Sequence, residues 1–190
     1  MTIEGVLKTL YPGVRGLLNQ QQASNLILCL ILLALEPIDS DTLRFFARFF
    51  TPADFDDLVQ ERTLVKLCGY PICPHPIRLK PQNGLTTFEW ARHFCSKHCS
   101  QAAKFYQKQL STEVLVTRKD VAYAPYLTMR YETDIILLDQ VEHYATVNHV
   151  SLIDAIRALA EHNFAALTKA FDHLTIENHG RDIQIRENNG

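Results

Sequence analysis

Four cysteines lie in the middle of the chain as two closely spaced pairs. The first pair has C-x4-C spacing, the second has C-x3-C spacing, and 21 residues separate them: Cys68, Cys73, Cys95 and Cys99. Thiolates at such spacings can meet one tetrahedral zinc ion with Zn–S bonds of about 2.3 Å. Gly69 and Pro71 favour a tight turn within the first pair, and the second pair spans one helical turn. We therefore predict one structural zinc ion held by these four thiolates.

Two other interpretations of the cysteines stay open. They could be four separate buried thiols that pack as small hydrophobic side chains. They could also form two disulfides, although no secretory signal follows Met1 and Cys29 leaves an odd number of cysteines. His98, at C-x2-H spacing from Cys95, is the alternative fourth ligand to Cys99.

Two predicted helices position the site. Thr51 and Pro52 form a typical helix start, with Asp54 at the third helical position. This helix should bring Glu61 and Arg62 to the metal site. The second helix runs over 96–110 and carries Cys99, with apolar residues at helical spacing and lysines on its other side.

The rest of the pattern is also mainly helical. Apolar periodicity predicts helices over 14–35, 42–50, 134–147 and 152–173, the third of them capped by Thr133 and Asp134. Segment 114–116 is predicted to be a short strand or an extended stretch. Segment 85–94 is predicted to be either a hairpin arm or a helical turn. We expect a mostly α protein, with at most a short β-hairpin near the zinc. The predicted organisation is one helical domain over 1–175, including a zinc-finger module at 61–110, and a polar tail over 176–190.

Charge is distributed unevenly along the chain. The formal net charge is −2. Residues 62–119 contain 10 basic and 2 acidic side chains, whereas 1–61 contain 4 and 8, and 120–190 contain 5 and 11. A basic centre between acidic flanks suits an anionic partner such as a phosphopeptide, unless the flanks neutralise it or the charges spread over a solvated face.

Several classes of protein are disfavoured. The longest apolar run is ten residues, over 26–35, whereas a membrane span needs about 20. Acidic net charge and the lack of aromatics interleaved with basic residues argue against direct nucleic-acid binding. Reduced cysteines suit the nucleus and cytoplasm. No C-x5-R phosphatase loop or P-loop occurs.

The region from Glu61 to about Arg118 resembles the atypical RNA polymerase II C-terminal-domain phosphatases, of the regulator-of-transcription or RNA polymerase II-associated-protein type. The shared features are Glu61-Arg62 before the first cysteine, Cys68-Gly69-Tyr70-Pro71-x-Cys73, Cys95-Ser96-x-x-Cys99, and the trailing Ser100, Phe105 and Gln109-Leu110-Ser111. Some members of the family carry a histidine as the last ligand, where this chain has Cys99.

The resemblance implies a zinc-containing protein serine phosphatase. Its substrate would be the phosphorylated heptad repeats of the largest RNA polymerase II subunit, and its role the transition from initiation to elongation. In that case Glu61 would activate or orient a water molecule, and Arg62 would hold phosphate oxygens. Further candidates for substrate contact are Tyr70, Arg78, Lys97, Lys104, Tyr106 and Lys108.

Two alternatives accompany this hypothesis. Glu61 and Arg62 could instead form a salt bridge at the helix end that supports the metal loop. The whole protein could be a non-catalytic zinc-bound module that binds RNA polymerase II for assembly or nuclear import. An enzyme requires a base and an oxyanion clamp that converge on one phosphorus position in a cleft.

Overall fold

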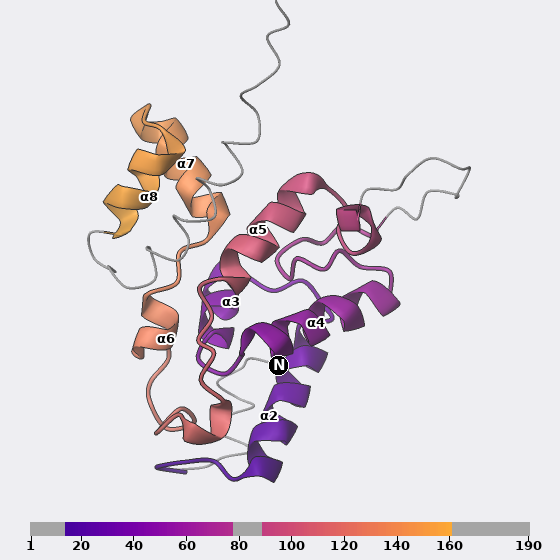
Figure 1. Cartoon of the computed structure of the whole chain (residues 1–190), viewed down its shortest axis with the longest axis vertical. Coiled ribbons are helices and arrows are strands. Elements are labelled where there is room, and N and C mark those ends of the chain that lie inside the picture. Colours follow the sequence, from indigo (N-terminus) through magenta and orange to yellow (C-terminus); the bar gives the residue numbers. More distant parts are fainter. Residues whose placement is uncertain (1–13, 78–88, 161–190) are drawn as a thin grey trace, which may run out of the picture.

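The structure is a computed structural model that describes residues 14–77 and 89–160. Helices make up its regular structure (Figure 1), and these residues contain no β-strand beyond one antiparallel bridge between Leu67 and Pro76. The elements are α2 (Gln20–Leu33), α3 (Ser40–Phe46), α4 (Pro52–Leu64), η1 (Glu89–Arg92), α5 (Lys97–Gln107), η2 (Leu115–Thr117), α6 (Arg130–Thr133), α7 (Leu138–Asn148) and α8 (Leu152–Ala160). The mostly α fold class is confirmed.

The two helices that flank the cysteines begin where local capping signals place them. Thr51 caps α4: its side chain accepts a hydrogen bond from the backbone of Asp54, whose carboxylate accepts one from the backbone of Thr51. Ser96 caps α5 through its bond to the backbone of Cys99. Such caps satisfy N–H groups that the first helical turn leaves unpaired.

The apolar faces of α2 to α5 share one core. Phenylalanines of α3 and the turn after it, together with Phe55 of α4 and Tyr106 of α5, lie at its centre. The rings of Phe55 and Tyr106 are 5.1 Å apart between centroids. Helices α7 and α8 pack side by side at one end of the molecule, next to α5 (Figure 1).

Buried arginines attach the irregular segment between α5 and α6 to this core. Arg48 forms an ion pair with Glu132, with 2.7 Å between Nε and Oε2, and neither side chain is exposed. Arg118, also unexposed, donates to the carbonyl of Ala47 at 3.1 Å. A buried guanidinium requires such partners for its N–H groups. These bonds therefore fix α6 and the irregular segment before it to the core.

Several sequence-based assignments are wrong. The helix predicted over 42–50 ends at Phe46. The helix predicted over 14–35 begins only at Gln20, because Gly16 has φ +86° and Asn19 caps the helix. Segment 114–116 contributes to a 3-10 turn instead of a strand. The helix predicted after Thr133 and Asp134 begins at Leu138, and those two residues end and follow α6.

Other predictions fall outside the described residues: the first and last parts of the 1–175 domain, the 152–173 helix beyond Ala160, and the 176–190 tail. Within the described part, the segment before α5 contains the helical turn η1. None of the helices in that part is long and apolar enough to cross a bilayer.

Candidate metal centre and the adjacent groove

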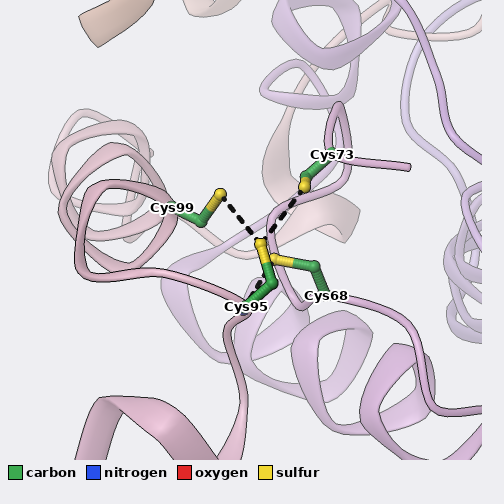
Figure 2. A group of neighbouring side chains, drawn as sticks. All are labelled: Cys68, Cys73, Cys95 and Cys99. Atoms are coloured by element: carbon green, nitrogen blue, oxygen red, sulfur yellow. Dashed lines mark hydrogen bonds between the residues drawn. The ribbon is translucent and has the colours of Figure 1, made fainter. Parts of the chain in front are cut away.

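The four paired cysteines meet at one point, as Figure 2 shows. Cys68 and Cys73 come from the loop after α4, Cys95 directly precedes α5, and Cys99 lies in its first turn. Their Sγ atoms all lie within 4.8 Å of one another. The Sγ–Sγ distances are 3.5 Å for Cys73–Cys95 and 3.6 Å for Cys95–Cys99.

These distances fit a metal site and exclude disulfides. Four thiolates bound to one tetrahedral zinc at about 2.3 Å each would be about 3.8 Å apart, whereas a disulfide requires about 2.05 Å. All five cysteines are free, and Cys29 lies away from the cluster, on α2. A set of four thiolates is typical of zinc or iron–sulfur centres. The cluster is therefore able to hold one metal ion.

His98 is directed elsewhere. Its Nε2 lies 2.9 Å from a carboxylate oxygen of Glu142 on α7, and its side chain is 45% exposed. It is therefore not part of the sulfur cluster, and the arrangement favours Cys99 as the fourth ligand.

Backbone bonds shape the first cysteine loop. Lys66 adopts φ 68°, which reverses the chain after α4. Cys68 then donates its N–H to the carbonyl of His75 at 3.0 Å, and Gly69 donates to the carbonyl of His93 at 2.7 Å. The second bond joins the two cysteine segments directly.

The side chain of Arg62 holds the same loop from inside the core. It has no exposed surface, and its guanidinium donates to the carbonyls of Cys68 at 2.7 Å and Cys73 at 3.0 Å. It also donates to the carbonyls of Ala34 and Glu36, just after α2. Burial lowers the pKa of Arg62, and nearby thiolates oppose that shift. The phosphate-clamp role expected for Arg62 is corrected to a structural one in this conformation, because its N–H groups are occupied inside the protein.

The thiols ionise unequally in the absence of a metal ion. The hydrogen bond between Cys99 and Cys68 lowers the pKa of Cys68 to about 5 and raises the pKa of Cys99. Burial raises the pKa of Cys73 to about 11. A metal ion would bind the protonated thiols by displacing their protons.

Gly69 provides a test of how tightly this loop is packed. A Cβ atom at this position would lie 2.7 Å from Cγ1 of Val59 and 2.9 Å from the carbonyl oxygen of His93. We expect Gly69→Ala to destabilise the protein by about 1–3 kcal/mol, the usual cost of overpacking, and to weaken metal retention. Thermal melting and metal analysis of the purified variant check this. An unchanged melting temperature with full metal content would mean that the loop can relax.

The structure separates the other candidate residues into buried and exposed groups. Tyr106 has no exposed surface and donates to the carbonyl of Leu43, and Tyr70 is buried with its hydroxyl 2.6 Å from Asp139. Burial raises the pKa of both phenols. The expectation that these two tyrosines contact substrate is corrected to a structural role in this conformation, because neither ring reaches the surface.

The charged candidates are accessible. Glu61 is exposed near the end of α4, and Lys97, Lys104 and Lys108 are exposed on α5. Arg78 lies outside the described residues.

A groove of about 840 Å³ is lined mainly by α4 and α5, together with η1 and with Leu138, Glu142 and Leu152 of α7 and α8. We call it the α4–α5 groove. Its lining includes Phe55, Val59, Trp90, Phe94, Lys97 and Lys104. Gln60 also lines it, whereas the neighbouring Glu61 does not. Sequence reasoning missed this groove. One signal was present: polar residues recur at 97, 100, 104 and 107, which lie on one helix face.

The fold and the site define a helical protein built around a four-cysteine metal centre. A model of the Rtr1/RPAP2 family matches residues 48–111. The crystal structure of the transcription regulator Rtr1 from Kluyveromyces lactis is 34% identical, with a TM-score of 0.58, and the match covers 65% of this chain and 88% of that one. The chain therefore belongs to the Rtr1/RPAP2 family.

Two further relatives support this assignment. The crystal structure of Saccharomyces cerevisiae Rtr1 (regulator of transcription) is 28% identical with a TM-score of 0.63, over 74% of this chain and 94% of that one. The S. cerevisiae protein named RNA polymerase II subunit B1 CTD phosphatase RTR1 is 40% identical over 95 residues, which are 44% of this chain. The match spans only 42% of that protein's length.

Proposed function

We propose that this protein is a zinc-containing phosphatase that removes phosphate from serines in the C-terminal repeats of the largest RNA polymerase II subunit. The observation that carries the proposal is the α4–α5 groove, which bears two exposed lysines and is lined by Phe94 and Ser100, the chain neighbours of Cys95 and Cys99. Relatives named as phosphatases of this C-terminal domain support the substrate class. Such a protein would act during the transition from initiation to elongation, and we place it in the nucleus and cytoplasm.

In this proposal the zinc ion is structural. Four thiolates fill the tetrahedral coordination of zinc and leave no position for a water molecule or a substrate oxygen. When bound, the ion would hold the loop of Cys68 and Cys73 against the start of α5. The chemistry therefore falls to side chains of the protein.

Glu61 is the proposed base. Its carboxylate is exposed on α4, next to Gln60 at the edge of the groove. It would orient or deprotonate the attacking water molecule. Lys97 and Lys104 would bind phosphate oxygens from the opposite helix, and Lys108 is a further candidate one turn beyond Lys104.

The proposal is tested by measuring phosphate release from a heptad-repeat peptide phosphorylated at the fifth-position serine. We expect Glu61→Gln to lower the rate by about 10²–10⁴-fold, the usual contribution of a general base. Folding and metal content should not change, because the side chain is exposed. Asp57→Asn, which alters another exposed carboxylate on α4, is the matched control and should keep the wild-type rate. Unchanged release in a folded Glu61→Gln protein would exclude this residue as the base.

The second candidate function is a non-catalytic module that binds RNA polymerase II, for assembly or nuclear import. One observation favours it: the guanidinium of Arg62 is buried, so among the described residues Glu61 and Arg62 do not converge on a phosphate position. Phosphopeptide binding without release, unaffected by Glu61→Gln, would support the module and contradict the phosphatase.

A further inference from the structure

The lysines of the α4–α5 groove have a fixed spacing. Lys97 and Lys104 are seven residues apart on α5, so they lie on the same helix face, two turns and about 10.5 Å from each other. An extended polyproline-type chain rises about 3.1 Å per residue, so three residues span about 9.3 Å. The lysine spacing therefore matches two side chains that are three residues apart on an extended peptide.

The acidic residues that line the groove already have partners. Asp56 accepts a hydrogen bond from the side-chain amide of Gln107 at 2.7 Å, and Glu142 lies 2.9 Å from Nε2 of His98. In contrast, no carboxylate within residues 14–77 or 90–160 forms an ion pair with Lys97 or Lys104. These two ammonium groups are therefore available to an anionic ligand.

The floor of the groove is apolar, and polar or aromatic side chains border it at Gln107 and at Trp90 and Phe94. Phe55, Val59 and Ala103 are buried beneath it. Gln107 bridges from α5 to the carbonyl of Pro52 at 2.9 Å and closes one end, and Trp90 and Phe94 line the other end, near the cysteines. Aromatic-lined grooves accommodate proline-containing chains in extended conformation.

We propose that the α4–α5 groove binds an extended, proline-containing peptide that carries two phosphates three residues apart, one held by Lys97 and the other by Lys104. This inference rests on the proposed function and refines it, since it makes the protein a reader of doubly phosphorylated repeats. A phosphate carries nearly two negative charges at neutral pH, so each one gains from a separate ammonium group.

The experiment measures affinity by fluorescence anisotropy with four peptides of one sequence. One carries a single phosphoserine; the others carry two, separated by one, three or six positions. The three doubly phosphorylated peptides have the same net charge, so general electrostatic attraction cannot create a preference among them. We expect the peptide whose phosphates are three positions apart to bind about fivefold more tightly than the other two doubly phosphorylated peptides. The reason is that its second phosphate gains an ion pair worth up to about 1 kcal/mol.

Variants assign the preference to the two lysines. Lys97→Gln and Lys104→Gln should each remove it, while Lys119→Gln, an exposed lysine of the segment between α5 and α6, should keep it. Circular dichroism and metal analysis check folding. Equal affinity for the peptides at every phosphate spacing would overturn the inference. So would a preference for the three-position spacing that persists in a protein carrying both Lys97→Gln and Lys104→Gln. Short RNA or anionic vesicles that displace the labelled peptide as effectively as the unlabelled peptide does would also overturn it. Such displacement would indicate a surface that binds polyanions in general.

Phosphate release is measured in parallel with the same peptides. Release from the singly phosphorylated peptide without any spacing preference in binding would leave the phosphatase proposal intact and refute the two-phosphate inference. Spacing-dependent binding without release would support the groove as a binding site and contradict catalysis.

Discussion

Cys68→Ser is expected to remove the bound metal and to unfold the centre of the protein. Structural zinc contributes about 10 kcal/mol or more of apparent binding free energy in small zinc-binding domains, which is comparable to the whole stability of a typical domain. Cys68 is fully buried, and its loop also anchors Arg62. A serine hydroxyl is a poor zinc ligand and leaves a three-sulfur site. Metal analysis and thermal melting should show less than one equivalent of zinc and a lost or greatly lowered transition.

Cys29→Ser is the matched control for this prediction. Its thiol is half-buried on α2, away from the sulfur cluster. The same atomic change should therefore leave metal content intact and cost little stability. Chelation of the wild-type protein should reproduce the effect of Cys68→Ser. A Cys68→Ser protein that keeps a full equivalent of metal and its melting temperature would disprove the ligand assignment.

Arg62→Ala is expected to destabilise the protein by about 3–5 kcal/mol, because several buried carbonyls lose their hydrogen-bond donor at once. The guanidinium donates to the carbonyls of Cys68, Cys73, Ala34 and Glu36. Truncation would leave buried carbonyls without donors, and each such group costs about 1–3 kcal/mol. Chemical denaturation and metal analysis are the measurements, and weaker metal binding should accompany the loss because two of the carbonyls belong to cysteine ligands.

The adjacent residue gives the control. Glu61 is exposed, so Glu61→Ala should change stability by less than about 0.5 kcal/mol. Arg62→Lys should recover only part of the loss, because an ammonium group cannot span four carbonyls in a fixed fork. If Arg62→Ala melted like the wild type and lost only phosphate release, the arginine would have to leave the core and contact substrate. Otherwise, inactivity of an Arg62 variant reports a damaged metal loop.

Local chemistry was enough to predict several features from the sequence. The four-cysteine cluster was predictable because the spacing within each pair is short and suits a shared metal ion. The start of α4 was predictable because Thr51, Pro52 and Asp54 satisfy the first helical turn among themselves. Within each cysteine pair and within the start of α4, the residues that interact are neighbours in the chain, so their pattern carries the information.

The start of α7 shows why such local signals can fail. Thr133 and Asp134 look like a helix cap, but the backbone of Ile136 is held by the side-chain amide of Gln109, which both accepts from its N–H at 2.9 Å and donates to its carbonyl at 2.8 Å. Both bonds come from Gln109, just beyond the end of α5 and 27 residues away in the sequence. They hold Ile136 in a non-helical conformation, and α7 begins only at Leu138.

Tertiary structure alone decided that Arg62 is buried and that the lysines of α5 are exposed. The sequence placed Glu61 and Arg62 side by side and offered both a catalytic and a supporting role. The arginine turns inward because its partners come from the end of α2 and from the cysteine loop, which meet only in the folded protein. The groove likewise exists only because α4 and α5, joined through the two cysteine segments, lie next to each other. A charged side chain can point to solvent or to carbonyls, and only the folded backbone determines which partners lie within reach.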